Sequence, residues 1–595
     1  MQALNKLLNQ PILYLTVGYD VDSDSGDIPY NRQSMSSLTI YNNQNEEYHI
    51  GNDEELRKHK NEIKQILSEC GMICVYDFAE WAHVLEKYFD EHLDRFNFVD
   101  IKYLYSYLHP DADQSIVSEW LIVEPFKIIF KLLSEFQTPG SSQYFFSIRN
   151  PYVTKAFYRI RKQGLPIDIE VMRNIYRQYN RFRKLAREEL LKRMRAIDDN
   201  VDESSVDNLD FMKEFFFIKL GLPPASYKDE KGMLRFYVQG TTTMPSYTKY
   251  NLDESSLRVM ETHGKHSDML MYYRIYQSIT NFMSKYCSAN SSFISSIDDG
   301  VIHAHFDITK TGRPRTFSPC LLNLPLGENE NIIELCRVHK IQEPIIWLKD
   351  AIRLNEGERL VSFDYKAAEM FALAFYSQDE NMLEALQDPN RDLHWECIEY
   401  CTGHNRKDLP RKFRQIGKGV NYKIPYGIAK TTLKNQLSLE TGFDIDISFI
   451  AKIVNYYKSK FPKAVKQLER WKEDSWFFGA FGLYRDYTES SKNPYAIERE
   501  KMNAPLQSLV ADLLAKSILQ IFSESDSIRI PIPLYDALYC IVTSDEQEQT
   551  IEEAMQQEVK YQDKKIKFKT EKRQLLTGQA GELVTKHYCL LHSAC

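Results

Sequence analysis

Short apolar runs alternate with polar turns over residues 11–50, and this alternation predicts a meander of β-strands. Helical periodicity follows over 53–69 and 78–89. The segment 138–142 combines proline and glycine with small polar residues, which indicates a first domain boundary. Beyond it, residues 151–195 have a basic helical pattern, for which a solvated helix face is the usual explanation.

Residues 361–372, VSFDYKAAEMFA, change from a strand-like to a helix-like pattern just after Asp364. A carboxylate at the end of a buried strand suits a hard cation such as Mg²⁺, which is held by one or two carboxylates together with the phosphates of its substrate. An aspartate that caps a helix would give the same local pattern. The stretch alone therefore leaves both interpretations open.

Length and composition restrict the class of protein. A chain of 595 residues, 43% of them hydrophobic, predicts about two to four domains. The ten cysteines form no paired framework, the N-terminus lacks a signal-peptide pattern, and no run of 18 apolar residues occurs. We therefore expect a soluble, intracellular protein without a membrane span. The net charge of -8 argues against indiscriminate nucleic-acid binding but allows a local basic groove.

A second stretch, RQIGKGVNYKIPYG, places Arg414, Lys418, Tyr422 and Tyr426 four residues apart. On a helix this spacing forms one slowly rotating stripe. Two cations can neutralise phosphates, and two phenol rings can stack on a base and sugar. Chance spacing on a surface helix is the alternative. Proline at position 425 predicts that the helix ends or kinks at the preceding residue.

A second carboxylate decides between these alternatives. LYDALYCIV at 534–542 places Asp536 in an apolar, β-rich segment. Two aspartates that come from two strands far apart in sequence are what a two-metal phosphoryl-transfer centre requires.

The order and spacing of these stretches resemble the polymerase I family (family A) of DNA polymerases over about residues 150–570. VSFDYKAAE resembles motif A, RQIGKGVNYKIPYG motif B and LYDAL motif C. TGRPRTFSPCLLNLP resembles the loop before motif A, and REKMNAPLQSLVADLLAK the helix before motif C. The resemblance implies an α+β multidomain fold, a right-hand polymerase with palm, fingers and thumb, behind a small N-terminal α/β 3′–5′ exonuclease-like domain.

The resemblance also implies roles for individual residues. Asp364 and Asp536 would hold two Mg²⁺ ions, and Lys418 is a candidate for protonating the leaving group. The residues expected to contact the incoming nucleotide or the templating position are Arg414, Lys418, Tyr422, Tyr426 and Glu369, the last as a steric gate against a 2′-hydroxyl. The residues expected at the DNA are Arg313, Arg499, Asn503, Gln507 and Tyr535.

Three departures from the family pattern stand out. Motif C reads Tyr535, Asp536, Ala537 where the family has His-Asp-Glu, so its third acid is missing and a phenol replaces the primer-end histidine. Lys366 and Ala367 replace the usual polar pair of motif A. Lys423 replaces a usual glycine in motif B.

The same resemblance suggests domain boundaries. We expect the exonuclease-like domain over 1–145, the polymerase entry and thumb over 146–300, the palm with motif A over 301–400, the fingers with motif B over 401–500, and the palm with motif C and a tail over 501–595. Residues 572–595 fall beyond the usual end of the family and carry no interpretation.

In the first domain, Asp20, Asp22 and Asp77 lie where the resembling exonuclease has metal ligands. Its third motif has a spacing match only at Tyr107 and Asp111, and this match comes too soon in the chain. We therefore expect a structural remnant with weak or absent proofreading, because a multi-carboxylate metal centre lacks a ligand.

One further cluster, His394, Cys397, Cys401 and His404, has a spacing that could suit zinc. It falls where the resembling family has an ordinary helix, so a zinc site is not favoured.

The sequence thus predicts a template-directed DNA polymerase that acts on primer-template DNA and dNTPs, with accessory replication proteins as further possible partners. A phage or viral origin would fit. One alternative is a single-subunit RNA polymerase, which shares the motif B pattern, although Glu369 argues against it. The other is a non-catalytic DNA-binding accessory subunit, which would have no reason to keep Asp364, Asp536, Arg414 and Lys418 together.

Overall fold

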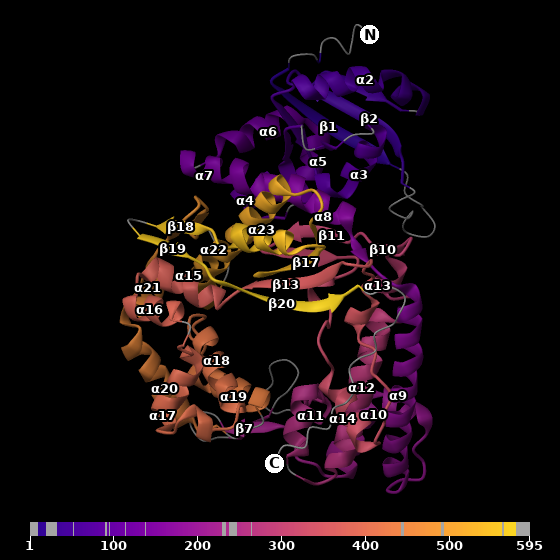
Figure 1. The fold of residues 1–595 in the computed structure, drawn as a ribbon, viewed down its shortest axis with the longest axis vertical. Helices are drawn as coiled ribbons and strands as arrows, with labels where there is room; N and C mark the ends of the chain where they lie inside the picture. The colour runs from indigo at the N-terminus through magenta and orange to yellow at the C-terminus, as the bar shows by residue number, and fades with distance from the viewer. Residues whose placement is uncertain are drawn as a thin grey trace.

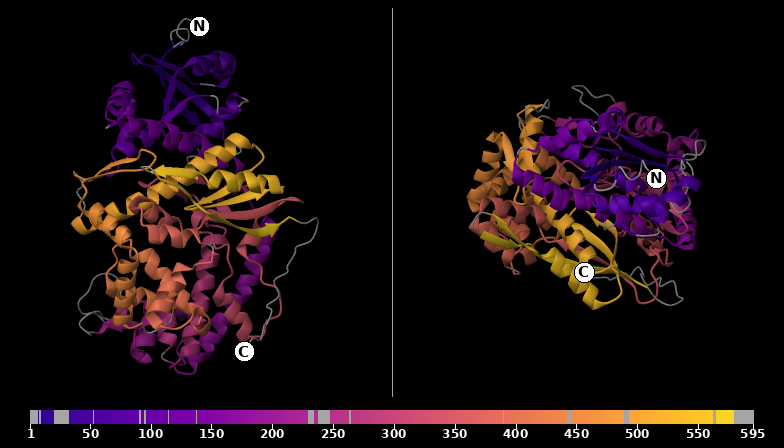
Figure 2. Two further views of the ribbon diagram at one scale, coloured as in Figure 1. Left: turned by 60° about the vertical axis from the view of Figure 1, so that its left-hand side comes forward. Right: turned by 90° about the horizontal axis from the view of Figure 1, so that it is seen from above.

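The structure is a computed structural model, and it describes most of the chain. The described residues are 7, 10–19, 33–51, 53–89, 92–93, 96–113, 115–136, 138–228, 234–236, 247–262, 264–388, 390–441, 445–488, 493–561 and 564–578. An N-terminal domain lies on one side of a central sheet, and two helical units lie on the other side (Figures 1 and 2).

The N-terminal domain is built on a five-stranded sheet of order β3-β2-β1-β4-β5. Its strands are β1 (Ile12–Tyr19), β2 (Met35–Asn42), β3 (Glu47–Ile50), β4 (Met72–Val75) and β5 (Phe98–Asp100). The first three pair antiparallel, as the predicted meander requires, whereas β1, β4 and β5 run parallel. The helices are α2 (Asp53–Glu69), α3 (Phe78–Phe89), α4 (Ile101–Leu108), α5 (Ser115–Val123) and α6 (Pro125–Ser134). The first two match the predicted helical segments.

Alternating side chains of the central strand β1 explain why both faces of this sheet are covered. Leu13 and Leu15 pack in one buried cluster with α2 and α3, whereas Tyr14 packs in a second cluster with α4, α5 and α6. The domain is therefore a three-layer α/β unit.

The predicted boundary segment at 138–142 forms the start of a helix rather than an extended spacer. Thr138 and Ser141 form a capping box, and Pro139 occupies the first turn of α7 (Pro139–Tyr144). The chain continues through η3 (Phe145–Arg149), η4 (Tyr152–Ala156) and α8 (Phe157–Gln163).

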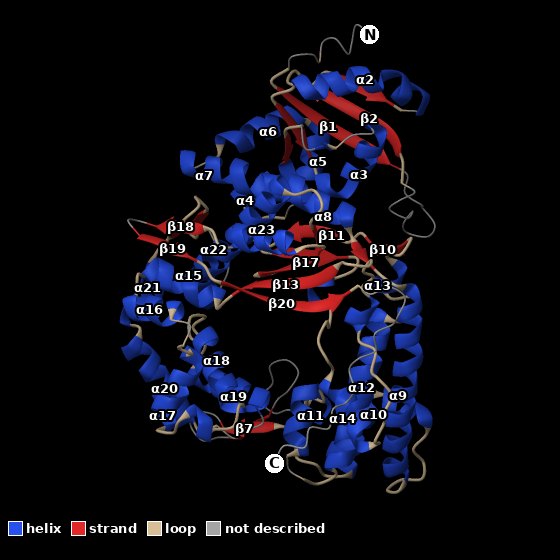
Figure 3. Ribbon diagram, viewed as in Figure 1, coloured by secondary structure: helices blue, strands red, loops and turns tan. Residues whose placement is uncertain are grey.

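The unit predicted as the thumb is nearly all helical (Figure 3). The long helix α9 (Ile169–Arg195), capped by Asp168, packs along α12 (Ser267–Tyr286). The other elements are η5 (Glu203–Asp207), α10 (Leu209–Lys213), η6 (Glu214–Lys219), β7 (Ser226–Lys228), β8 (Leu234–Phe236), η7 (Tyr247–Lys249), α11 (Glu254–Glu261) and α13 (Ser292–Ser295).

The central sheet is antiparallel and has the order β16-β17-β13-β20. Its strands are β13 (Arg359–Tyr365), β16 (Arg529–Leu534), β17 (Ala537–Val542) and β20 (Thr570–Thr577). Strand β20 includes residues 572–577, so part of the segment left without interpretation completes this sheet. The helices near it are α15 (Ala368–Ser377), α22 (Pro494–Glu524) and α23 (Asp545–Met555). Helix α14 (Glu330–Val338) instead packs against α9 and α12 of the unit predicted as the thumb. The short elements are β6 (Leu165–Pro166), β9 (Ile297–Asp298), β10 (Val301–Ile302), β11 (His305–Ile308), β12 (Pro314–Phe317), η8 (Leu321–Asn323), η9 (Leu348–Ala351), β18 (Glu558–Tyr561) and β19 (Lys564–Lys567).

The unit predicted as the fingers has a small core of its own. Its elements are α16 (Glu380–Gln387), α17 (Leu393–Thr402), η10 (Arg406–Asp408), α18 (Lys412–Lys423), α19 (Lys430–Thr441), α20 (Ile447–Lys460), α21 (Pro462–Glu473), β14 (Trp476–Phe478) and β15 (Tyr484–Asp486). Ile416 and Val420 of α18 are buried against α17, α19 and α20. Polar side chains of α18 can therefore lie on its opposite face.

Helix α22 is long and apolar enough to cross a membrane by length and composition. However, 67% of its most apolar window is buried inside the protein, as expected for a core helix. It packs against α15, α21 and α23.

Candidate active site

The two aspartates predicted as metal ligands lie side by side at one end of the central sheet. Asp364 is the penultimate residue of β13, and Asp536 lies in the two-residue turn that joins β16 to β17. Tyr535 adopts a positive φ of 51° in this turn. The backbone N–H of Tyr365 donates to the carbonyl oxygen of Asp536 at 3.0 Å, which fixes the turn beside β13.

Burial, together with repulsion between the two charges, disfavours ionisation of these carboxylates. Burial raises the pKa of Asp364 to about 7, with further contributions from the charges of Asp536 and Glu571. Burial also raises the pKa of Asp536, while Arg313 and Lys418 oppose that change. A bound divalent cation would remove the repulsion, and carboxylate oxygens are the ligands that such hard cations prefer. The two carboxylates therefore fit a divalent metal.

Glu571 is a site residue that the sequence did not reveal. In the sheet register, Asp364 is opposite Ala537 of β17 on one side and Glu571 of β20 on the other. Directly opposite residues of antiparallel strands share a face of the sheet. The carboxylate missing at position 537 thus has a counterpart on the other flank of Asp364. Among the described residues, however, no group of three or more His, Cys, Asp or Glu side chains is close enough to hold a metal together.

Helix α18 directs part of the predicted stripe toward the two aspartates. Burial and the charges of Asp536, Glu369 and Asp364 raise the pKa of Tyr422 to about 12. The Lys418 ammonium lies 5.9 Å from the centre of the Tyr422 ring. These contacts bring a phenol and a cation to the carboxylate pair.

Arg414 begins the same stripe and is held by a partner that the sequence did not suggest. Its Nε donates to Asp392 at 2.8 Å. Asp392 is also the N-cap of α17, so the guanidinium is oriented by a fixed helix end. Its side chain remains 38% exposed and accessible to an anion.

The predicted break at Pro425 is confirmed, because α18 ends at Lys423 and Ile424 forms its cap. Tyr426 follows in a turn, where burial and Glu369 raise its pKa above the usual range. Lys423, whose identity had no explanation, forms an ion pair with Glu440 of α19.

Glu369 lies in the first turn of α15 and is paired with a loop residue. The Arg313 Nη2 donates to Glu369 Oε1 at 2.5 Å, and both side chains are largely buried. The hydroxyl of Thr311 in the same loop contacts Gln507 of α22 at 3.4 Å. The loop before motif A is thus connected to both neighbouring helices.

The other predicted DNA contacts are less closely tied to this group. Arg499 is exposed, and its Nε donates to the carbonyl of Tyr495 at 3.3 Å. Tyr535 is 41% exposed. The side-chain oxygen of Asn503 is buried and has no hydrogen-bond partner within the described part of the chain.

A family model described as DNA polymerase family A matches residues 185–573. This chain belongs to DNA polymerase family A. DNA polymerase I of Helicobacter pylori (strain ATCC 700392 / 26695) is 26% identical over 308 residues, which cover 50% of this chain and 31% of that relative. The thermostable DNA polymerase I of Thermus aquaticus is 25% identical over 279 residues, which cover 44% of this chain and 30% of that relative. The matched region thus spans less than a third of these curated relatives.

The fold of this family A chain is similar to a solved structure over nearly its full length. The POL domain of Pol1 from M. smegmatis, solved in complex with DNA primer-template and dNTP, has a TM-score of 0.71 at 16% identity. The match covers 94% of each chain. This likeness confirms the predicted right-hand polymerase fold.

The predicted exonuclease ligands of this family A chain are only partly described. Asp20 and Asp22 lie outside the described residues. Asp77 forms an ion pair with Lys102 at 2.8 Å. Asp100 accepts the backbone N–H of Phe78 at 2.7 Å, and burial followed by the charge of Asp77 raises its pKa to about 7. A lysine therefore occupies the position beside Asp77 where a metal would need access.

Tyr107 and Asp111 contact residues outside the N-terminal domain, in β15 and in the loop between β11 and β12. The Tyr107 hydroxyl accepts the backbone N–H of Tyr484 at 3.4 Å, and Asp111 forms an ion pair with Lys310. The spacing match for a third exonuclease motif is thus an interdomain contact.

The possible zinc ligands lie around the core of the fingers. The Cys397 thiol donates to the carbonyl of His394 at 3.2 Å, and burial raises its pKa to about 12. Cys401 is also buried, whereas His404 is exposed. The cysteines pack as small apolar side chains, so they carry no metal proposal.

The sequence also did not reveal a buried network that contacts the loop before motif A. Asp512 of α22 accepts the Tyr144 hydroxyl at 2.6 Å and lies 3.1 Å from the Arg149 guanidinium. Arg149 also donates to the carbonyl of Thr311 at 3.0 Å. Thr311 and Asp512 are more than a hundred residues from Arg149 in sequence, so no local pattern indicates these contacts.

Proposed function

We propose that this chain extends the 3′ end of a DNA primer along a template, with dNTPs as substrates. The observation that carries this proposal is the convergence of Asp364 and Asp536 with Lys418 and Tyr422, in a chain of the DNA polymerase family A fold. Cations, phenols and carboxylates of this kind together suit a nucleoside triphosphate and its metals.

In the proposed reaction, the primer 3′-hydroxyl oxygen attacks the α-phosphorus. The new O–P bond forms as the bond to the β,γ-diphosphate breaks, the hydroxyl proton passes to water, and pyrophosphate leaves. Asp364 and Asp536 would hold two Mg²⁺ ions, which when bound lower the pKa of the attacking hydroxyl and neutralise charge on the leaving group. Lys418 is the proposed donor of a proton to pyrophosphate.

The remaining residues orient the substrates. Arg414 is accessible and held by Asp392, so it can bind triphosphate oxygens without losing its position. Tyr422 would pack on the sugar and base. Glu369, kept in place by Arg313, would exclude a 2′-hydroxyl. We place Tyr426 at the templating position, and Arg499, Asn503, Gln507 and Tyr535 along the DNA.

Primer extension with dNTPs and Mg²⁺ tests this proposal. Asp364→Asn and Asp536→Asn should each abolish extension while primer-template binding, measured by fluorescence anisotropy, stays within a few-fold of the parent. Asp526→Asn is the matched control, because that side chain is 99% exposed, pairs with Arg159 of α8 and precedes β16, at the opposite end of the strand from Asp536. Extension near the parental rate by either site variant would refute the assignment.

The same assay separates the rival activities. If rNTPs are used in preference to dNTPs, the chain is an RNA polymerase. If neither is used and DNA still binds, the chain is a non-catalytic DNA-binding protein. We further propose that the N-terminal domain has a structural role and little or no exonuclease activity, supported by the Lys102 pair with Asp77.

A further inference from the structure

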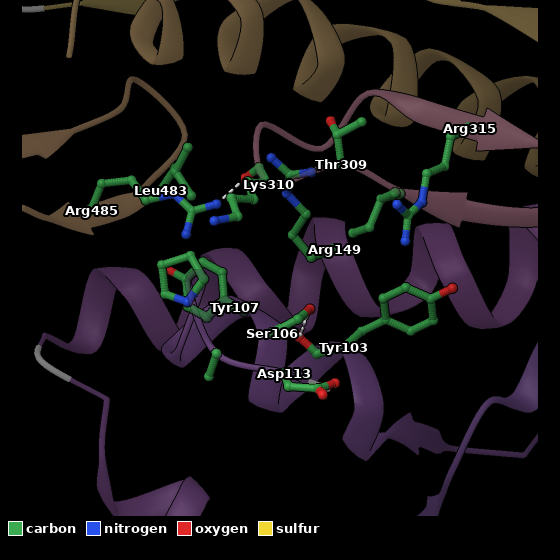
Figure 4. Close-up of a pocket in the computed structure, with 13 residues that line it drawn as sticks. Tyr103, Ser106, Tyr107, Asp113, Arg149, Thr309, Lys310, Arg315, Leu483 and Arg485 are labelled. Carbon is green, nitrogen blue, oxygen red and sulfur yellow. Dashed lines mark hydrogen bonds between the residues drawn. The ribbon is translucent and has the colours of Figure 1, made fainter. Parts of the chain in front are cut away.

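A cavity of about 310 Å³ lies between the N-terminal domain and the palm. Helix α4 provides one wall with Tyr103, Ser106 and Tyr107, and the β11–β12 loop with Lys310 faces it (Figure 4). The hairpin of β14 and β15 contributes Arg485. The volume is roughly ten times the share of one water molecule in the liquid, so it can hold a small polar ligand.

The lining of this interdomain cavity carries more cations than carboxylates, with Asp113 as its acidic side chain. Four cations border it, namely Arg149, Lys310, Arg315 and Arg485. Three of them have carboxylate partners: Arg149 pairs with Asp512, Lys310 with Asp111, and Arg315 with Asp307 at 2.5 Å.

Arg485 is different, because it is only 6% exposed and forms no ion pair with any described residue. Its Nη2 donates to the carbonyl of Lys310, whereas its Nη1 is buried and has no hydrogen-bond partner in the described part of the chain. An uncompensated buried guanidinium is costly in free energy unless an anion joins it. The second buried guanidinium, that of Arg149, adds repulsion.

We infer that the interdomain cavity binds a phosphate group, and that Arg485 is its principal donor, with its buried Nη1 turning toward the anion. The fork of a guanidinium matches two oxygens of a phosphate, and Lys310 and Arg315 at the rim can draw an anion inward. The partly exposed ring of Tyr107 adds an aromatic surface to the wall.

The cavity is connected to the polymerase site through one loop. Thr309 and Lys310 line the cavity, whereas Arg313, three residues further on, pairs with Glu369. A phosphate in the cavity would therefore hold the loop that positions Arg313.

The phosphate can come from a single-stranded template segment or from a free anion, and the experiment distinguishes the two. The template source rests on the proposed polymerase function, whereas the free anion does not. In one arm, inorganic phosphate or pyrophosphate is added to the metal-free full chain and the melting temperature is measured. In the other, anisotropy compares a primer-template that has a long unpaired template extension with one that has a single unpaired nucleotide.

Arg485→Gln should remove the effect in whichever arm the parent responds. Loss of one charge-assisted contact corresponds to binding that is weaker by about tenfold or more. For a strand, the slope of log K against log salt should also fall by about 0.7. Arg485→Lys should restore part of the binding. Arg470→Gln is the control, since that exposed arginine lies on α21 away from the cavity.

If Arg485→Gln does not fold, Lys310→Gln replaces it, because the Lys310 side chain is 44% exposed. Equal responses of parent and folded variant in both arms would overturn the inference. Asp364→Asn should keep the response, so a failure of the polymerase assignment is distinguishable from a failure of this site.

Discussion

The raised pKa of Asp364 predicts that ionisation of this carboxylate destabilises the native protein increasingly as the pH rises. In the native protein Asp364 keeps its proton up to about pH 7, whereas its ordinary pKa is 3.8. Between these values the native state binds more protons than the unfolded chain, so stability falls as the pH rises. The destabilisation is absent below the ordinary pKa and complete above pH 7.

A difference of about three pH units corresponds to about 4 kcal/mol, at about 1.4 kcal/mol for each. This value is an upper bound, because Asp364 is only half-buried and water can relax around it. We expect Asp364→Asn to gain about 1–3 kcal/mol over the parent above pH 7 in the absence of metal. Near pH 4 the two proteins should be equally stable.

The assay is thermal or urea unfolding of parent and variant in EDTA, over about pH 4 to about pH 8.5. Mg²⁺ should raise the stability of the parent at high pH and leave that of Asp364→Asn almost unchanged. The exposed Asp526→Asn variant should show no pH-dependent gain. A gain that is equal at all pH values, or a variant that is less stable at high pH, would refute the electrostatic argument.

Three further predictions concern specificity and proofreading. Glu369→Ala should admit ribonucleotides in primer extension, whereas Glu369→Gln, which keeps the volume, should exclude them; equal sugar selectivity in both would contradict the gate. Tyr422→Phe should reduce the use of dideoxynucleotides several-fold in competition with dNTPs, because a polar contact worth about 0.5–1.5 kcal/mol is lost. A mismatched 3′ end incubated with Mg²⁺ and no dNTPs should be shortened little, and rapid shortening that disappears in an Asp20→Ala, Asp22→Ala double variant would disprove the remnant assignment.

The part of the candidate site around Asp364 and α18 could be predicted because its signals are local. Asp364 ends an apolar run that turns into a helix, and Arg414, Lys418 and Tyr422 follow helical spacing. The end of α18 before Pro425 follows from ring geometry alone. In each case the determining residues are neighbours in the sequence.

The rest of the site depends on which strands and helices meet, which no local pattern encodes. Glu571 reaches Asp364 only because β20 pairs with β13 in one register. Lys102 reaches Asp77 because the neighbouring parallel strands β4 and β5 end side by side, just before the two residues. Arg149 pairs with Asp512 of α22, which is more than 300 residues away in the sequence.

The Arg149 contact connects the segment that follows the N-terminal domain to the loop that carries Arg313, because Arg149 donates to the carbonyl of Thr311. Gly312 has a φ of +84°, and a Cβ there would lie 1.2 Å from the Arg149 Nη1. Gly312→Ala should therefore displace Arg149 and the loop that carries Arg313.

Gly221→Ala is the matched control for this prediction, because Gly221 has a φ of +60° with no atom within 4 Å of its added Cβ. Both variants bear backbone strain of about 1–2 kcal/mol, but only Gly312→Ala also loses the packing of Arg149. We expect primer extension to fall about tenfold or more in Gly312→Ala and to stay near the parental rate in Gly221→Ala, with both proteins folded at the assay temperature. Equal extension by the two variants would mean that the loop tolerates the displacement, and that the contact between Arg149 and this loop does not position Arg313.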